Sequence, residues 1–321
     1  MSADEYADYA LKTNNLGKHY GRSGRNWALR DCTLALPTGR MAALVGPNGA
    51  GKTTLLHLAV GLLTPSAGDV QVFGHSPQRE PMAVLPRVGF VAQDHPLYRG
   101  FSAADLFTMG RKLNPRWDQQ SAVSRMQRLG IPLDRPVGKL SGGQQSQVAL
   151  AMTLAKRADL ILLDEPVASL DPLARRDFLR TLTDAAAQHQ LTVLLSSHII
   201  ADLEQACDYL IILSASRVQL AGDITTIRRV HVWLVGPRAE AEAVARTQTV
   251  LARQDQGSQT SLLVRAGAKG QERGLALNPA WRRQDATLEE IVLAYLEQSA
   301  ESAPMLYAED ADTPRDMEVV K

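Results

Sequence analysis

Short apolar runs alternate with amphipathic stretches along the chain from about residue 11 to residue 220. Three of the runs are Met41–Val45, Leu160–Leu163 and Thr192–Leu195, and each of them is followed by a glycine or a polar residue. They are too short for helices, and continuous apolar runs of this length are typical of strands buried on both faces of a parallel sheet. The pattern therefore predicts an α/β domain whose chemistry lies at the carboxyl ends of these strands.

A helical insertion interrupts this alternation after Gln93. Breaks at Asn114-Pro115 and at Gly130 divide the segment into helix-like pieces, because proline and glycine commonly end helices. We expect a helical subdomain over about residues 94–145. A further helix is expected from Ser146 to about Lys156.

Residues 223–300 predict a second, smaller unit of the α+β type. Its expected elements are strands at Arg229–Val235 and Thr260–Val264 and a helix at Leu288–Gln298. Thr287, with Glu290 three residues later, forms the capping-box pattern that marks a helix start. Because the apolar residues of this helix form one stripe, it is expected to pack against the rest of the unit.

The two ends of the chain differ from the parts between them. Residues 1–10 predict a flexible N-terminus, which leaves residues 11–222 for the first domain. Residues 301–321 contain six acids, two bases and two prolines, with little apolar content. Such a segment cannot bury enough apolar surface to fold, so we expect a disordered acidic tail.

The composition indicates a cytosolic globular protein. A length of 321 residues suits about two domains, and the net charge of +1 gives no electrostatic reason to expect a nucleic-acid partner. Two cysteines are too few for a disulfide framework. No apolar run approaches the ~18 residues of a membrane span, and the acidic first residues do not resemble a secretory leader.

A glycine-rich loop follows the first apolar strand and opens a helical pattern at Thr54–Leu63. Its spacing is that of the phosphate-binding loop G-x-x-x-x-G-K-[ST], in which backbone amides and a helix N-terminus cradle phosphates. Lys52 can reach the β and γ phosphates, and the Thr53 hydroxyl is placed to ligate Mg²⁺. The loop predicts a nucleoside-triphosphate site made by Gly46, Pro47, Asn48, Gly49, Ala50, Gly51, Lys52, Thr53 and Thr54.

Two carboxylates end the second apolar strand, at Asp164 and Glu165. Asp164 is suited to hold Mg²⁺, directly or through water. Glu165 projects one residue further, where it could polarise the water that attacks the γ phosphate. A solvated strand end is the alternative for an isolated Asp-Glu pair, but the phosphate loop upstream favours the catalytic interpretation.

A second anion-binding helix entry precedes the helix expected at Ser146. Ser141, Gly142 and Gly143 offer a hydroxyl, two unhindered amides and a helix dipole, and Gln144 follows them. One nucleotide hardly needs two such sites in one domain. The second site is therefore expected to serve the nucleotide of another copy.

On these motifs the chain resembles the ATP-binding cassette (ABC) ATPases over most of its first ~220 residues. Leu140–Gln144 resembles their signature motif, and Asp164 with Glu165 resembles their Walker B end with its catalytic glutamate. The resemblance implies an α/β P-loop NTPase cassette, with a RecA-like core, an antiparallel β part and a helical subdomain. The small α+β unit would then be a C-terminal extension.

Four further positions match the family's motifs in sequence order. Tyr20 resembles the aromatic residue that stacks on adenine, and Gln93 the Q-loop glutamine that senses Mg²⁺ and the attacking water. Asp171, in Ser169-Leu170-Asp171, resembles the D-loop, and His198 the switch histidine that contacts the γ phosphate. One departure is the stretch Gln145–Gln147, where many members carry an arginine.

The resemblance implies a mechanism with two partners. Two cassettes, in a homodimer or a heterodimer, would close head to tail around two ATP–Mg²⁺. A separately encoded membrane permease would use that motion at the cytoplasmic face of the cell membrane. Its coupling helix would bind near Tyr98, Phe101 and Leu106, unless this segment is packed internally. The stretch Gly222–Gln298, followed by the acidic tail, resembles the C-terminal extensions of bacterial subunits paired with ABC-2-type permeases, commonly exporters. A regulatory ligand-binding or dimerisation module is the alternative for this stretch.

Two other classes are open to a chain with a phosphate loop. Soluble ABC proteins of translation usually carry two cassettes, whereas this chain has one phosphate loop. ABC proteins of DNA maintenance insert long coiled coils between the phosphate loop and the signature motif. In this chain Lys52 and Ser141 are only 89 positions apart, which leaves no room for such an insertion. A small-molecule kinase or GTPase would have no use for Leu140–Gln144. We therefore expect the ATPase subunit of a transporter, with no nucleic-acid partner.

Overall fold

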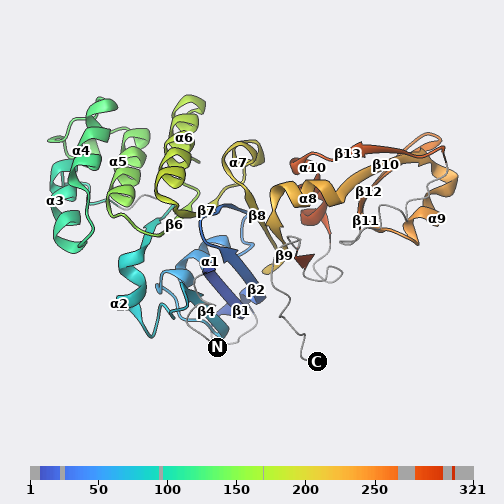
Figure 1. Ribbon diagram of the computed structural model, residues 1–321, viewed down its shortest axis with the longest axis horizontal. Helices are drawn as coiled ribbons and strands as arrows, with labels where there is room; N and C mark the ends of the chain where they lie inside the picture. Colours follow the sequence, from blue (N-terminus) through green and yellow to red (C-terminus); the bar gives the residue numbers. More distant parts are fainter. Residues whose placement is uncertain are drawn as a thin grey trace. The chain divides into compact units, whose positions relative to one another are not determined.

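The computed structural model describes two compact units. The first comprises Met1–Asp208 and Leu213–Val218, and the second comprises Tyr209–Ile212 and Gln219–Lys321 (Figure 1). The residues described are 8–21, 26–93, 97–168, 170–266, 279–298 and 306–307. Residues 1–7 and nearly all of residues 301–321 lie outside this set. The flexible N-terminus and the disordered acidic tail therefore remain predictions. The predicted domain limits also remain predictions.

An antiparallel sheet opens the first unit. Its strands are β1 (Tyr9–Tyr20), β2 (Asn26–Pro37) and β4 (Ala67–Val72), in the order β2-β1-β4. The register of β1 against β2 shifts at several points. Such bulges interrupt the period of two by which a half-buried strand is recognised in sequence. This sheet confirms the antiparallel part of the expected fold.

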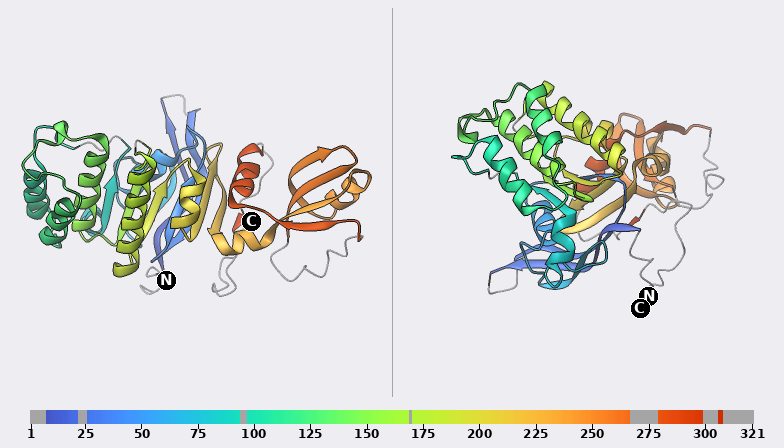
Figure 2. Two further views of the ribbon diagram at one scale, coloured as in Figure 1. Left: turned by 90° about the horizontal axis from the view of Figure 1, so that it is seen from above. Right: turned by 60° about the vertical axis from the view of Figure 1, so that its left-hand side comes forward.

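A parallel sheet forms the centre of the first unit (Figure 2). Its strands run in the order β3 (Met41–Val45), β7 (Thr192–Ser196), β6 (Leu160–Asp164) and β5 (Val88–Val91). Every residue of β3, β6 and β7 is buried, which confirms the interpretation of the three apolar runs. Because the strands are parallel and in register, their carboxyl ends meet along one edge.

Helices connect these strands. They are α1 (Lys52–Ala59), α2 (Pro81–Val84), the 3-10 turn η2 (Leu85–Arg87), α6 (Pro172–His189) and α7 (Ile200–Ala206). The predicted helix Thr54–Leu63 was wrong at both ends. It begins at Lys52, because Gly51 in the left-handed region is its N-cap, and it ends at Ala59 before Gly61, which also has a positive φ.

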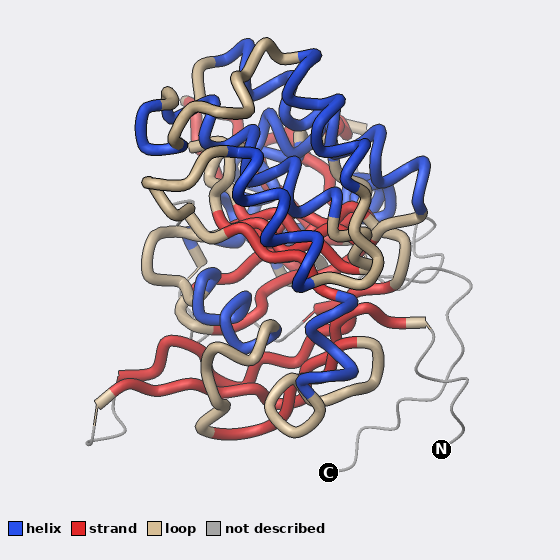
Figure 3. The backbone as a smooth tube through the Cα atoms, turned by 90° about the vertical axis from the view of Figure 1, so that its left-hand side faces the viewer, coloured by secondary structure: helices blue, strands red, loops and turns tan. Residues whose placement is uncertain are grey.

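The helical subdomain is formed by α3 (Ala103–Leu113), α4 (Gln119–Arg128), the 3-10 turn η3 (Val137–Lys139) and α5 (Gly142–Ala155). Figure 3 shows the helices gathered to one side of the strands of this unit. Phe107, Met126 and Val148 pack in their shared core. The helix expected from Ser146 begins at Gly142 instead, because Ser141 and Gln144 form a capping box.

The second unit contains an antiparallel sheet in the order β11-β12-β10-β13, together with parts of β8 and β9 and the strand β14 beside β9. Its elements are β8 (Tyr209–Ser214), β9 (Arg217–Asp223), α8 (Ile224–Val230), β10 (His231–Pro237), the 3-10 turn η4 (Arg238–Glu240), α9 (Ala241–Ala245), β11 (Thr249–Gln256), β12 (Gln259–Arg265), β13 (Arg282–Asp285), α10 (Leu288–Glu297) and β14 (Leu306–Tyr307).

Two predictions for this unit are confirmed and one is wrong. The Thr287–Glu290 capping box is present and starts α10, and β12 contains the whole of the predicted strand at 260–264. The strand expected from Arg229 begins at His231, because Asp223 caps α8 and this helix continues to Val230. Within the ranges that the structure describes, no helix is both long and apolar enough to cross a membrane.

A buried histidine joins α8, β10 and α10 in the second unit. His231 is fully buried; its Nδ1 lies 2.7 Å from the Ile227 carbonyl oxygen and its Nε2 lies 3.0 Å from the Tyr295 hydroxyl. A carbonyl can only accept, so Nδ1 carries the proton and Tyr295 donates to Nε2. Burial, together with the charge of Arg265, lowers the pKa of His231 to about 4.

We expect this unit to lose stability on mild acidification. Unfolded His231 takes up a proton below its ordinary pKa of 6.5, whereas the folded side chain does so only near pH 4. The free energy of unfolding should therefore fall by about 3 kcal/mol between pH 6.5 and pH 4. Urea unfolding of the full chain, followed by hydrogen exchange in β10, measures this. His231→Gln should flatten the dependence, and an unchanged slope in that variant would contradict the assignment.

Candidate functional site

The phosphate loop lies between the end of β3 and the start of α1. Two of its glycines are fixed by close backbone contacts: a Cβ on Gly46 would lie 2.2 Å from the Leu213 carbonyl oxygen, and a Cβ on Gly51 would lie 2.3 Å from that of Ala28. Gly51 also has a φ of 107°, which disfavours any other residue. Only glycine fits at both positions, which leaves the loop's backbone amides unhindered.

The remaining loop residues divide into an open rim and a buried base. Pro47, Asn48 and Gly49 are exposed, whereas Ala50 and Thr54 are buried. An exposed rim above a helix N-terminus is the arrangement that accepts an anion.

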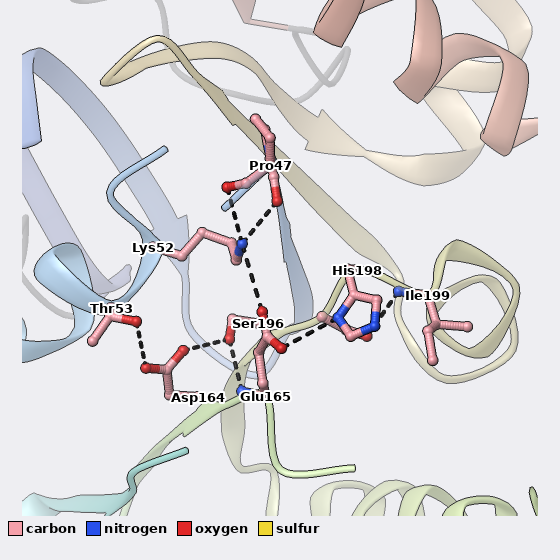
Figure 4. A network of polar contacts seen from close by, with 10 residues as sticks. Pro47, Lys52, Thr53, Asp164, Glu165, Ser196, His198 and Ile199 are labelled. Atoms are coloured by element: carbon pink, nitrogen blue, oxygen red, sulfur yellow. Dashed lines mark hydrogen bonds and ion pairs between the residues drawn. The ribbon is translucent and has the colours of Figure 1, made fainter. Parts of the chain in front are cut away.

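Lys52 is held at the centre of this loop (Figure 4). The side chain is only 6% exposed. Its ammonium donates to the carbonyl oxygens of Gly46, at 2.7 Å, and of Pro47, at 3.3 Å, and lies 3.7 Å from Glu165 Oε1. The loop backbone therefore points this cation toward the end of β6.

A chain of hydrogen bonds joins the ends of β6 and β7. The Thr53 hydroxyl donates to Asp164 Oδ2 at 2.7 Å, and the Ser196 hydroxyl donates to Asp164 Oδ1 at 2.7 Å. The Glu165 backbone amide donates to the same Ser196 oxygen at 2.8 Å. Asp164 is almost fully buried, and the parallel register pairs it with Ser196. Both Asp164 oxygens are thus oriented by neighbouring hydroxyls.

Ser196 is a site residue that the sequence reasoning missed. A serine after an apolar run is common, and only the register of β6 against β7 shows that this one reaches Asp164. The available signal was that two neighbouring parallel strands, β6 and β7, both end in polar residues.

Glu165 lies between two basic side chains. Its Oε1 faces Lys52, and its Oε2 lies 3.2 Å from His198 Nδ1. Its backbone has a φ of 45°, a left-handed conformation that costs a non-glycine residue ~1–3 kcal/mol. At this strained turn the carboxylate faces Lys52 and His198. The His198 side chain is half exposed.

The oxygen atoms at this edge suit a magnesium ion. Mg²⁺ is commonly held by one hydroxyl and one carboxylate of the protein, with water and phosphate oxygens completing its octahedron. Thr53 Oγ1 and Asp164 provide that pair, already 2.7 Å apart. Gln93, the third predicted ligand, is exposed just beyond the end of β5. Among the described residues, this edge included, no group of three or more His, Cys, Asp or Glu side chains could hold a metal ion.

The second helix entry is built separately from this network. Ser141 Oγ accepts from the Gln144 amide at 3.2 Å, while Gln144 Oε1 accepts from the Ser141 amide at 3.1 Å. A Cβ on Gly142 would meet nothing within 4 Å, and one on Gly143 would lie 3.6 Å from Leu170 Cδ2. Among the described residues, no hydrogen bond or ion pair joins this helix end to the Lys52–Glu165 network.

Two further predicted residues also occupy exposed helix or strand ends. Asp171 is the N-cap of α6 and accepts from the amides of Leu173 and Ala174; its neighbour Ser169 lies outside the described residues. Tyr20 ends β1, is 46% exposed, and has its hydroxyl 3.4 Å from Thr54 Oγ1. The exposed Tyr20 ring therefore lies near the start of α1.

Comparison with known proteins identifies the family. The family model described as ABC transporter matches residues 29–168. The thiamine import ATP-binding protein ThiQ of Salmonella choleraesuis is 32% identical over 197 residues, which are 59% of this chain and 83% of that protein. The chain belongs to the ABC transporter family of ATP-binding proteins.

Other ABC proteins extend this likeness. The sulfate/thiosulfate import ATP-binding protein CysA of Yersinia pseudotuberculosis is 33% identical over 222 residues, which are 66% of this chain; the match spans about 60% of that relative's length. An ABC transporter ATP-binding subunit of known structure is 26% identical, with a TM-score of 0.61 over 68% of this chain and 92% of its own. The cbiO1 subunit of Clostridium perfringens is also 26% identical, with a TM-score of 0.58 over 75% and 94% of the two chains.

The Ser196 contacts generate a prediction for ATP turnover. In Ser196→Ala, Asp164 Oδ1 loses its hydrogen bond and the Glu165 amide loses its acceptor. Both carboxylates are then less firmly oriented, so turnover of ATP should fall by about tenfold or more. A coupled phosphate-release assay measures the rate. Ser197→Ala is the matched control, because Ser197 Oγ accepts only from the Ile199 amide among the described residues; equal rates in the two variants would contradict the role of Ser196.

Proposed function

We propose that this chain is the ATP-binding and ATP-hydrolysing subunit of an ABC transporter. The observation that carries the proposal is the convergence of Lys52, Thr53, Asp164 and Glu165 at one edge of the parallel sheet. That edge combines a phosphate loop, a hydroxyl–carboxylate pair suited to Mg²⁺ and a carboxylate held beside two basic groups. Membership of the ABC family supports the same activity.

Each polar group at this edge has a proposed role. Lys52 and the loop amides, from Gly46 to Thr54, would bind the β and γ phosphates. Thr53 and Asp164, with Gln93, would hold Mg²⁺, which supplies charge neutralisation between those phosphates. Glu165 would accept a proton from the attacking water, and His198 would contact the γ phosphate. The 3.2 Å contact between His198 and Glu165 supports a shared site for these last two roles.

A second cassette would complete the site. Two helix N-termini expose the residues proposed to act on a nucleotide bound by another copy. These are Ser141 and Gly142 at α5 and Asp171 at α6. Gly143 and Gln144, which follow Gly142, are partly exposed and would contribute to the same contact. ATP bound between two such surfaces favours the closed pair by its differential affinity for that state. Hydrolysis removes this link and opens the pair.

The proposed partner is a separately encoded membrane permease, which would hold the chain at the cytoplasmic face of the membrane. Tyr98 and Phe101 are exposed before α3, with ring centroids 5.3 Å apart, and exposed aromatic pairs suit a protein interface. Leu106, which was expected to share this surface, is buried in the core of the subdomain instead. Relatives named as import proteins match this chain over about two thirds of its length, so export is not part of the proposal.

We predict that Glu165→Gln binds ATP but hydrolyses it at least ~100-fold more slowly, because the proton acceptor is lost. With ATP and Mg²⁺ the variant should accumulate as a dimer, which size-exclusion chromatography with light scattering detects. Adding Ser141→Arg to this variant should abolish the dimer, since the guanidinium would occupy the exposed nest. Hydrolysis by Glu165→Gln at the wild-type rate would contradict the proposed role.

The same trapped variant distinguishes a transporter subunit from a soluble ABC protein of translation or DNA maintenance. Tagged Glu165→Gln, incubated with detergent-solubilised membranes and ATP–Mg²⁺, should retain a multi-spanning protein. Tyr98→Ser with Phe101→Ser should reduce that recovery without changing the ATP affinity. Recovery of ribosomes or nucleic acid instead would leave the ATP site intact and reject the transporter proposal.

A further inference from the structure

Arg125 is a charged side chain buried inside the helical subdomain. It lies on α4 beside the core residue Met126, and it is only 6% exposed. One terminal nitrogen donates a short hydrogen bond to Gln147 Oε1 on α5, and Gln147 is itself 7% exposed. The Arg125 Nε is buried and has no hydrogen-bond partner among the described residues. A buried guanidinium with incomplete pairing lowers the stability of the folded state. We therefore expect a functional reason for its position.

Neighbouring charges act on Arg125 in both directions. Asp177 lies on α6, and its charge favours the protonated form of Arg125. Burial, and to a lesser extent the nearby Arg128, act in the opposite direction, and together they lower the pKa of Arg125 to about 10. The guanidinium is therefore charged at neutral pH. Its hydrogen bond to Gln147 connects α4 with α5.

The helices α5 and α6 carry the exposed ends that the proposed function assigns to the nucleotide of the partner cassette. Ser141 caps α5 and Asp171 caps α6. Gln147 and Asp177 each stand six residues after their cap, roughly 9 Å along the helix. The two ends are neighbours, because a Cβ on Gly143 would lie 3.6 Å from Leu170 Cδ2.

We propose that Arg125 is a positioning residue that holds α5, and with it the Ser141 cap, in one fixed place beside Leu170 at the start of α6. The inference rests on the proposed function, because it assumes that Ser141 and Asp171 act on a nucleotide held by another copy. A planar guanidinium suits this place because its donors have a fixed geometry, which orients the Gln147 amide oxygen.

A charge-relocation experiment tests the role. Arg125→Met keeps the volume and removes the charge, and Arg125→Gln combined with Gln147→Arg moves the guanidinium from α4 to α5. Arg125→Met should bind a fluorescent ATP analogue as tightly as the wild type, because its phosphate loop is intact, while kcat for ATP falls about tenfold. The double variant should recover most of that loss. Arg128→Gln, three residues further along α4 and exposed, is the matched control and should keep the wild-type kcat.

The outcomes separate this inference from the proposed function. If Ser141→Arg lowers kcat but Arg125→Met does not, the positioning role fails and the proposed function stands. If Ser141→Arg leaves kcat unchanged, the proposed function fails and the positioning role fails with it. Should Arg125→Met not fold, as judged by its thermal midpoint, the double variant decides, since it retains one buried guanidinium; a folded double variant without recovery overturns the inference.

Discussion

The parallel register of the central sheet is the constraint on which the site depends. It brings the ends of β3, β6 and β7 to one edge, where the phosphate loop, Asp164 and Ser196 meet. The strands are wholly buried and, between their end residues, apolar, so the polar side chains of β6 and β7 lie at the strand ends. The chemistry is therefore located by the fold, and the strained turn at Glu165 adds the one side chain that the strand direction alone would not place.

The acids and hydroxyls at this edge form a network rather than independent contacts. Asp164 receives hydrogen bonds from Thr53 and Ser196, and Ser196 in turn accepts from the Glu165 amide. In a buried site, each fully paired group strengthens the orientation of the next. Lys52 links this network to the phosphate loop through Glu165. A ligand of the loop therefore meets side chains that are already oriented.

The sequence predicts the parts whose signal is local. Three buried strands were recognisable because each is dominated by consecutive apolar residues, and the Thr287 capping box because it spans four positions. The parts that depend on distant contacts were missed or misplaced. Bulges interrupt the period-two pattern of β1 and β2, which makes these strands hard to recognise in the sequence. The role of Ser196 depends on its register with Asp164. Leu106 is buried because α3 packs in the core of the subdomain. The buried pairing of Arg125 with Gln147 likewise joins side chains that are 22 positions apart in the sequence.

The central claim is that the oriented Asp164 and Thr53 oxygens form the magnesium site of a bound nucleotide. The most direct measurement is isothermal titration of ATP into the wild type and Asp164→Asn, each with and without Mg²⁺. The account predicts that Mg²⁺ tightens ATP binding to the wild type and has little effect on Asp164→Asn, because the asparagine carries no charge. An equal effect of Mg²⁺ on the two proteins would contradict it.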